Sequence, residues 1–170
     1  MIIVLEGRRG VGKTALAEWV TAIINYNSDV KAVAHKFERD SNPYRSMMGT
    51  VKAFGPEETV HVIDRFHLSE YVYSAYYSRI PWAKLVSQTF DIRSRLLDYR
   101  SLVCYVYCND KARAERQLGR NKPDEIPYKF WADAKELFLP IPIDNGTLSI
   151  GGTAQQIVKK WRKKWILCGS

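Results

Sequence analysis

Short apolar runs alternate along the chain with longer segments in which apolar residues recur every three or four positions. The first run, residues 1–5, is apolar at every position, which is typical of a strand buried on both faces of a sheet. Later runs share this strand character. The pattern therefore predicts strands at residues 1–5, 30–37, 59–63, 102–108 and 141–143.

The segments between these runs show the spacing of helices. After the first strand, apolar side chains at Leu16, Trp19, Val20 and Ile23 fall on one helix face. The pairs Asn42-Pro43 and Gly55-Pro56 are typical of turns, so the segment that they bound is predicted to be rich in loops. The remaining segments predict helices at residues 13–24, 69–78, 82–99, 110–118, 127–139 and 153–167.

Strands that alternate with helices indicate an α/β fold. Right-handed crossovers between successive strands give a parallel sheet with helices on both faces. The 170 residues suffice for one such domain. Because ligands of these sheets bind at the carboxyl ends of the strands, residues that follow a strand are the first candidates for a functional site.

Composition narrows the class of protein. With 46% hydrophobic residues the chain is too apolar for a disordered protein, and it has no run near the roughly 18 apolar residues of a membrane helix. No signal peptide precedes the first strand, so we expect a cytoplasmic protein, the cytoplasm of a phage-infected host cell included. The cysteines fit a reducing compartment, and Cys104 and Cys108 are expected to pack in the core.

The charge balance favours anionic partners. Lys and Arg number 26 against 18 Asp and Glu, which gives a net charge of +8. A positive field attracts nucleotides, nucleic acids or acidic membranes. Five of the positive charges fall within residues 159–164. They form either the solvated face of a terminal helix or part of a surface that binds a phosphate polymer, and both interpretations stay open.

A phosphate-binding motif follows the first strand and opens the first helix. Its pattern is G-x-x-x-x-G-K-[ST], and the strand before it and the helix after it are the context that this motif requires. Glycines let backbone N–H groups turn toward phosphate oxygens, Lys13 would reach the β- and γ-phosphates of ATP, and Thr14 would ligate Mg²⁺. The motif comprises Gly7, Arg8, Arg9, Gly10, Val11, Gly12, Lys13 and Thr14.

A second motif begins where the third predicted strand ends. Asp64 and Arg65 follow an apolar run, and serines and tyrosines come next. With these residues, the lead-in Leu5-Glu6-Gly7, a basic stretch after the fourth strand and residues 143–146, the chain resembles the thymidylate kinase and deoxynucleoside kinase group of P-loop kinases. The resemblance implies a three-layer P-loop NTPase fold with a five-stranded parallel sheet, and a lid near residues 111–126.

The resemblance also implies roles at two strand ends. Arg65 would hold the acceptor or the transferred phosphate, and Asp64 would lie beside Mg²⁺. Glu38, after the second strand, is the first candidate for the general base that takes the proton of the acceptor hydroxyl, with Asp40 and Asp64 as rivals. Two structural alternatives stay open, namely an ion pair between Arg65 and Glu70, and Asp64 as a cap of the next helix.

The last family features are a basic lid and a loop beside adenine. Arg113, Arg116 and Arg120 follow the fourth strand, and by the resemblance they would close over the phosphates and stabilise the transferred phosphoryl group. An ordinary basic surface helix is the alternative. The loop that would lie beside the adenine ring follows the fifth strand and comprises Asn145, Gly146 and Thr147.

Arg9 bears on the acceptor. Thymidylate kinases usually carry an acidic residue at this loop position, beside the sugar 3′-hydroxyl of the free nucleotide. Arginine cannot accept a hydroxyl proton, but it can pair with a phosphodiester, as in a nucleotide within DNA. Phage kinases that phosphorylate 5-hydroxymethyluracil within DNA belong to the same P-loop group, and resemblance to them would imply such an acceptor.

The sequence thus predicts an ATP- and Mg²⁺-dependent kinase that acts on a pyrimidine deoxynucleotide, with one in DNA slightly favoured. A free deoxynucleoside monophosphate, a deoxynucleoside, or a P-loop NTPase without kinase activity are the alternatives. GTP in place of ATP and the oligomeric state, with a homodimer among the options, stay open.

Overall fold

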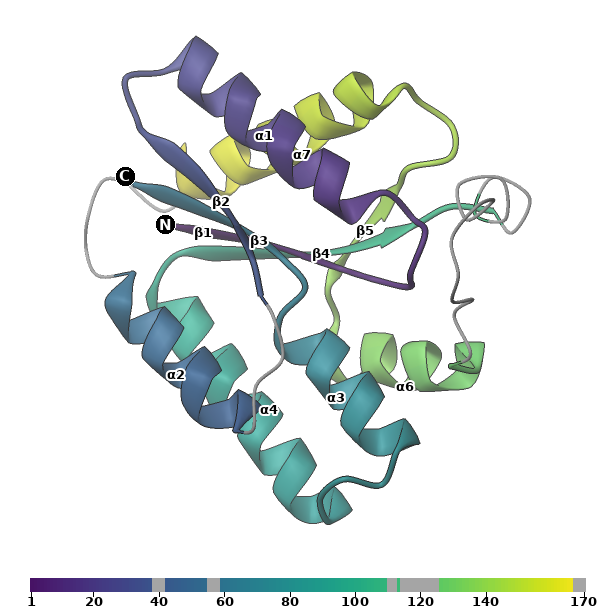
Figure 1. Cartoon of the computed structure of the whole chain (residues 1–170). Coiled ribbons are helices and arrows are strands. Elements are labelled where there is room, and N and C mark those ends of the chain that lie inside the picture. The colour runs from purple at the N-terminus through teal and green to yellow at the C-terminus, as the bar shows by residue number, and fades with distance from the viewer. Residues whose placement is uncertain (38–41, 55–58, 110–112, 114–125, 167–170) are drawn as a thin grey trace.

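The computed structural model describes residues 1–37, 42–54, 59–109, 113 and 126–166, and it has the predicted α/β architecture. A parallel sheet with the strand order β2-β3-β1-β4-β5 forms the middle layer (Figure 1). Its strands are β1 (Ile2–Glu6), β2 (Ala32–Lys36), β3 (Val60–Asp64), β4 (Ser101–Tyr107) and β5 (Ile141–Asp144).

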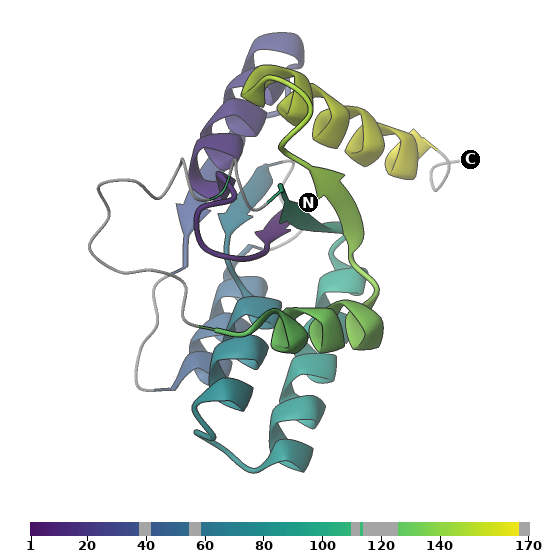
Figure 2. The same cartoon turned by 90° about the vertical axis from the view of Figure 1, so that its right-hand side faces the viewer.

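Helices cover both faces of the sheet (Figures 1 and 2). The helices α1 (Lys13–Asn27) and α7 (Ile150–Ile166) lie on one face. The helices on the other face are α2 (Pro43–Ala53), α3 (His67–Tyr76), α4 (Trp82–Asp98) and α6 (Tyr128–Phe138). The predicted three-layer fold is therefore confirmed.

The apolar run of β1 is continuous because each face of this central strand meets a different core. Ile2 and Val4 are fully buried in the core under α2, α3, α4 and α6. Ile3 and Leu5 are fully buried on the opposite face, under α1 and α7. Cys104 packs in this second core, and burial raises the pKa of its thiol to about 12, which supports the predicted packing role.

The prediction of a loop-rich segment after Asn42 is wrong, because residues 43–53 form α2. The Asn42 side chain accepts a hydrogen bond of 3.2 Å from the backbone N–H of Arg45, and Pro43 stands in the first turn, where its missing N–H costs nothing. Met47 and Val51, one turn apart, are buried. The Asn-Pro pair therefore begins a helix.

Two other expectations, the helix at residues 110–118 and the lid near residues 111–126, concern residues that the structure does not describe, apart from Arg113 and Ile126. Within the described part of the chain, no helix is both long and apolar enough to cross a membrane.

The strand order brings three strand ends together. β1 is flanked by β3 and β4, and the register pairs Leu5 with Asp64 and Glu6 with Tyr105. The loop that follows Glu6 therefore emerges between the ends of β3 and β4. Lys164 lies at the other end of the sheet, since its ammonium donates a 2.6 Å hydrogen bond to the carbonyl of Ser101, the first residue of β4.

Candidate active site

The loop between β1 and α1 has the backbone that the phosphate-binding motif requires. Gly7, Gly10 and Gly12 have φ angles of 137°, 86° and 89°, a region that other residues rarely adopt. Gly7 has a second constraint, because a Cβ there would lie 2.2 Å from the carbonyl oxygen of Val106 in β4. The loop is thus pressed against the sheet, and the N-terminus of α1 opens toward its interior.

Lys13 is held inside this loop. Its ammonium donates hydrogen bonds of 2.8 Å to the Gly7 carbonyl and 2.7 Å to the Arg8 carbonyl, and only 4% of the residue is exposed. A long cationic side chain is seldom this buried unless it is paired. The charge is therefore positioned where the motif would receive phosphate oxygens.

Thr14 and Asp64 meet beside the loop, although 50 positions separate them in sequence. The Thr14 hydroxyl donates a 2.5 Å hydrogen bond to Oδ2 of Asp64. The other carboxylate oxygen, Oδ1, is buried and has no hydrogen-bond partner among the described residues. A hydroxyl and an unsatisfied carboxylate oxygen form the oxygen-only donor set that suits Mg²⁺ together with phosphate oxygens and water. The residues predicted to hold Mg²⁺ therefore fit that ion.

Arg65 has a strained backbone at the end of β3. Its φ of 65° is unusual for a residue with a side chain, and its N–H donates a 3.0 Å hydrogen bond to the Leu5 carbonyl. The side chain lines a cavity of about 330 Å³, which we call the β3-side cavity. Its other lining residues are Phe37, Phe66, Ser69, Glu70, Tyr73, Tyr77 and Arg79.

Glu6, the last residue of β1, binds the N-terminus of α3 to the sheet. It is fully buried, and its carboxylate accepts hydrogen bonds from the backbone N–H groups of Phe66, Leu68 and Ser69 and from the Ser69 hydroxyl. Burial raises the pKa of Glu6, and these donors oppose the rise by stabilising the carboxylate. Glu6 therefore caps α3, a role that the sequence had offered to Asp64, and it joins α3 to the residue before the phosphate loop.

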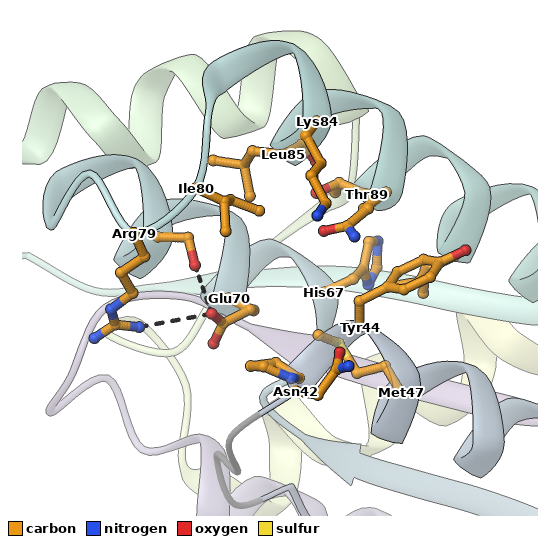
Figure 3. Close-up of a pocket in the computed structure, with 14 residues that line it drawn as sticks. Asn42, Tyr44, Met47, His67, Glu70, Arg79, Ile80, Lys84, Leu85 and Thr89 are labelled. Atoms are coloured by element: carbon orange, nitrogen blue, oxygen red, sulfur yellow. Dashed lines mark hydrogen bonds and ion pairs between the residues drawn. The ribbon is translucent and has the colours of Figure 1, made fainter.

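Glu70 is paired with Arg79. The distance from the Arg79 guanidinium to Oε1 of Glu70 is 3.6 Å, and the Ser74 hydroxyl donates a 2.5 Å bond to the same oxygen (Figure 3). The ion pair that the structure gives Glu70 is thus with Arg79, in place of the alternative with Arg65. A second cavity, of about 310 Å³, is lined by residues of α2, α3 and α4, with His67 at its wall, and Glu70 and Arg79 line it as well (Figure 3).

A further cavity of about 540 Å³, the β4-side cavity, lies on the other side of the phosphate loop. It brings together Arg8, Val11 and Arg113, three residues predicted to bind the nucleotide. Aromatic and basic side chains complete it, because the Arg8 guanidinium lies 5.9 Å from the ring centre of Tyr128 and the Lys135 ammonium 4.9 Å from that of Tyr105. Its remaining lining residues are Tyr107, Cys108 and Asn109.

The loop after β5 braces the phosphate loop. Asn145 is 1% exposed, and its side-chain amide donates a 2.7 Å hydrogen bond to the Val11 carbonyl. A Cβ on Gly146 would lie 3.3 Å from Cβ of Cys108, so this loop also adjoins the end of β4. Thr147 is exposed. The structure thus places Asn145 and Gly146 near the β4-side cavity and gives Asn145 a supporting contact.

Three predicted site residues, Glu38, Arg116 and Arg120, lie outside the described residues. Sequence reasoning missed the ion pair between Glu70 and Arg79, and also Tyr107 and Tyr128 in the β4-side cavity. The signal for Tyr107 was its place at a strand end, whereas nothing local distinguished Tyr128 or Arg79 from surface residues.

No known protein family and no curated protein matches this sequence. Among solved structures, the YorR protein of Bacillus subtilis in complex with phosphorylated GDP is similar, with a TM-score of 0.66, 17% identity, and coverage of 95% of this chain and 96% of YorR. A putative polyphosphate kinase 2 from Pseudomonas aeruginosa has a TM-score of 0.70 and 15% identity over 99% of this chain, which spans 39% of that protein. At these identities the likeness establishes the fold, and the chain has the P-loop NTPase fold found in these neighbours.

Proposed function

We propose that this protein is a kinase that transfers the γ-phosphate of Mg-ATP to a pyrimidine deoxynucleotide. We favour an acceptor within DNA, a hydroxymethylated pyrimidine such as 5-hydroxymethyluracil, over a free deoxynucleoside monophosphate or a deoxynucleoside. The observation that supports transfer most strongly is the presence of two cavities, one lined by Arg8 and Val11 of the phosphate loop and one lined by Arg65 at the end of the neighbouring strand β3. Hydrolysis of a nucleotide needs one such site, whereas transfer between two substrates needs two.

The β4-side cavity suits the donor. Arg8, Arg113 and Lys135 supply positive charge beside the loop, and Tyr107 and Tyr128 supply ring faces for a base. Lys13 would meet the β- and γ-phosphates and exchange its bonds to the loop carbonyls for bonds to phosphate oxygens.

The β3-side cavity suits the acceptor. Arg65 lines it and bonds through its N–H to the carbonyl of Leu5, two residues before the phosphate loop, and Phe37, Phe66 and Tyr73 offer ring faces. The paired Glu70 and Arg79 present a hydrogen-bond acceptor next to donors, the complement of the polar edge of a base.

In the proposed reaction the acceptor hydroxyl oxygen forms a bond to the γ-phosphorus, the bond between that phosphorus and the bridging oxygen breaks, and ADP leaves. The hydroxyl proton passes to a carboxylate, for which Glu38 is the first candidate. Lys13 and Arg65, with Arg116 from the lid, would stabilise the charge on the transferred group. Mg²⁺, held by Thr14 and Asp64, would supply charge neutralisation at the phosphates.

Arg9 supports an acceptor that is part of DNA. A guanidinium in the phosphate loop can pair with the phosphodiester on the 3′ side of the acceptor nucleotide, a group that free thymidylate lacks. If the acceptor base is in a duplex, it must be flipped out to reach the γ-phosphate.

The test is to incubate the protein with Mg²⁺ and ATP labelled at the γ-phosphate, with four acceptors in parallel: DNA containing 5-hydroxymethyluracil, unmodified DNA, thymidylate and thymidine. We expect label in the hydroxymethylated DNA. Label in thymidylate or thymidine alone would move the acceptor to the free nucleotide or nucleoside. ADP formation with label in none of the four would contradict a kinase and leave an NTPase.

The Arg9→Asp variant sharpens the acceptor assignment. It should weaken binding of the DNA acceptor and reduce the slope of log affinity against log salt by about 1, as expected for one lost phosphate contact. An unchanged slope would remove Arg9 from the contacts to DNA.

A further inference from the structure

A groove runs along the seam between α1 and α7, on the face of the sheet away from the two cavities. It has a volume of about 580 Å³. Its floor is apolar, with Ile23 and Val158, and its rim is polar and basic. The rim residues are Asn27, Gln155, Lys159, Arg162 and Lys163. Figure 1 shows the two helices side by side, as this groove requires.

The positive charge of the groove is local and exposed. Lys159, Arg162 and Lys163 are all exposed, and the sequence of α7 contains no acidic residue. Arg162 donates a 3.3 Å hydrogen bond to the Asn27 carbonyl, which fixes its guanidinium across the seam. Lysines in the last helical turn complement the helix dipole, but Lys159 stands before that turn and has no such role.

Two exposed aromatic side chains accompany the charge. Trp19 is 48% exposed and Tyr26 89% exposed, both on α1. The Trp19 ring lies over Gly151, where an added Cβ would approach it to 3.5 Å, so it marks the far end of the same seam. Ile23 lies one turn after Trp19, and Tyr26 follows nearly one further turn along α1.

We propose that this α1–α7 groove binds a single-stranded segment of nucleic acid, with phosphates on Lys159, Arg162 and Lys163 and bases against Trp19 and Tyr26. Basic side chains that follow a backbone, interleaved with aromatic side chains that stack on bases, are how proteins bind single strands without reading sequence. Charge complementarity selects this occupant, because an apolar or basic peptide would leave the basic rim uncompensated.

The basic end of the groove is remote from the phosphate loop. Asn27, which is bonded to Arg162, is the last residue of α1 and lies about 21 Å from Lys13 at about 1.5 Å per residue. The inference therefore goes beyond the proposed function, since a kinase for free nucleotides could also carry this surface. If the bound strand also supplies the acceptor, it must bridge the roughly 21 Å between the basic rim and the phosphate loop.

The experiment measures fluorescence anisotropy of a labelled 20-nucleotide oligo(dT) between 50 and 200 mM salt. The test variant is Lys159→Gln/Arg162→Gln/Lys163→Gln. The matched control is Lys31→Gln/Lys52→Gln/Arg95→Gln, which removes three exposed positive charges elsewhere. The test variant should lower the slope of log affinity against log salt by about 2, at about 0.7 per phosphate contact, and the control should leave it unchanged.

The aromatic part is tested with Trp19→Ala/Tyr26→Ala, which should weaken binding by about 10-fold or more if bases stack there. Equal losses in the two charge variants, or no binding of oligo(dT) at 50 mM salt, would overturn the inference. Equal affinity for a duplex together with no effect of the aromatic variant would overturn the single-strand assignment. Where thymidylate or thymidine is labelled, the label should be the same in all these variants, because none of them changes the phosphate loop or the two cavities. Loss of oligo(dT) binding and loss of phosphate transfer are therefore measured separately, and failure of this inference can be told apart from failure of the kinase proposal.

Discussion

Two regions of the central sheet hold buried polar groups, but they differ in what surrounds those groups. At the carboxyl ends of β1 and β3, Lys13 and Asp64 lie against a loop with positive φ angles, and one oxygen of Asp64 has no partner among the described residues. On β2 and β3, His35 and His61 share a 3.0 Å hydrogen bond, and Phe54 stacks on His61 with ring centres 3.9 Å apart. Nε2 of His61 is also buried without a partner among the described residues, but the histidines pack against an aromatic ring, whereas Lys13 and Asp64 adjoin a glycine loop and the strained backbone of Arg65.

The comparison teaches where to look for function in this fold. Unsatisfied charge and strained backbone persist only when surrounding structure fixes them, and they accumulate where a ligand would supply the missing partner. Substitutions of Lys13 and Arg65 should therefore change activity more than stability. Substitution of Glu6, which supports this end of the sheet, and protonation of the histidines by acid should change stability first.

The largest expected effect is that of Lys13→Ala. Removing this ammonium should lower turnover by on the order of 10²-fold or more, because it lies inside the loop on the Gly7 and Arg8 carbonyls, where a phosphate would bind. Label transfer from ATP measures the effect, and Lys31→Ala, at an exposed position, is the control. Turnover within a few-fold of the unaltered protein would mean that the loop does not hold the transferred phosphate.

Arg65→Gly separates activity from stability. Loss of a charged hydrogen-bond donor should lower kcat/KM by about 10- to 100-fold. The free energy of unfolding should stay within about 1 kcal/mol or rise, since glycine tolerates the φ of 65° that strains arginine. Urea unfolding monitored by circular dichroism gives the stability. A large loss of stability would show that the Arg65 side chain is structural.

Glu6→Gln should act in the opposite way, through stability. One carboxylate oxygen becomes an NH₂ group that cannot accept, so at least one buried donor from Leu68 or Ser69 loses its partner. The unfolding free energy should fall by about 1–3 kcal/mol. Glu18→Gln on the exposed face of α1 is the matched control and should change little. Unchanged stability would contradict the capping role.

The smallest expected effect is a loss of unfolding free energy as the pH falls from 7 to 4.5. Burial lowers the pKa of His61 to about 4 and that of His67 to about 3, from an ordinary value of 6.5. Above pH 6.5 both are neutral in the folded and unfolded states and stability is unaffected. As pH falls below 6.5 the unfolded chain takes up protons that the folded chain refuses, so stability declines until pH passes below the folded values.

The check is the unfolding free energy from urea titrations between pH 7 and 4.5. The His61→Gln variant has a side chain that does not titrate, so it should lose part of the slope of unfolding free energy against pH. The control Lys31→Gln, at an exposed position, should retain the full slope. A profile between pH 6.5 and 4.5 that is the same in the unaltered protein and in His61→Gln would contradict the burial of a neutral His61.

Local pattern was sufficient for most of the fold and for the centre of the site. The apolar run of β1, the glycine pattern after it and the Asp64-Arg65 pair at the end of β3 each carry their meaning within a few residues, because strands, turns and helix starts follow short-range rules. The failure at α2 has the same origin. Asn-Pro suits both a turn and a helix start, and only the burial of Met47 and Val51 in the core decided between them.

What the sequence by itself determined is the α/β class and the position of the phosphate loop between β1 and α1. Only the tertiary structure decided that Glu6 caps α3, that Glu70 pairs with Arg79, and that α6 brings Tyr128 beside Arg8. These contacts join residues that are far apart in the chain, and no local sequence pattern predicts them. They arise because the carboxyl ends of parallel strands lie at one edge of the sheet, and because the packing of the helices brings distant side chains together there.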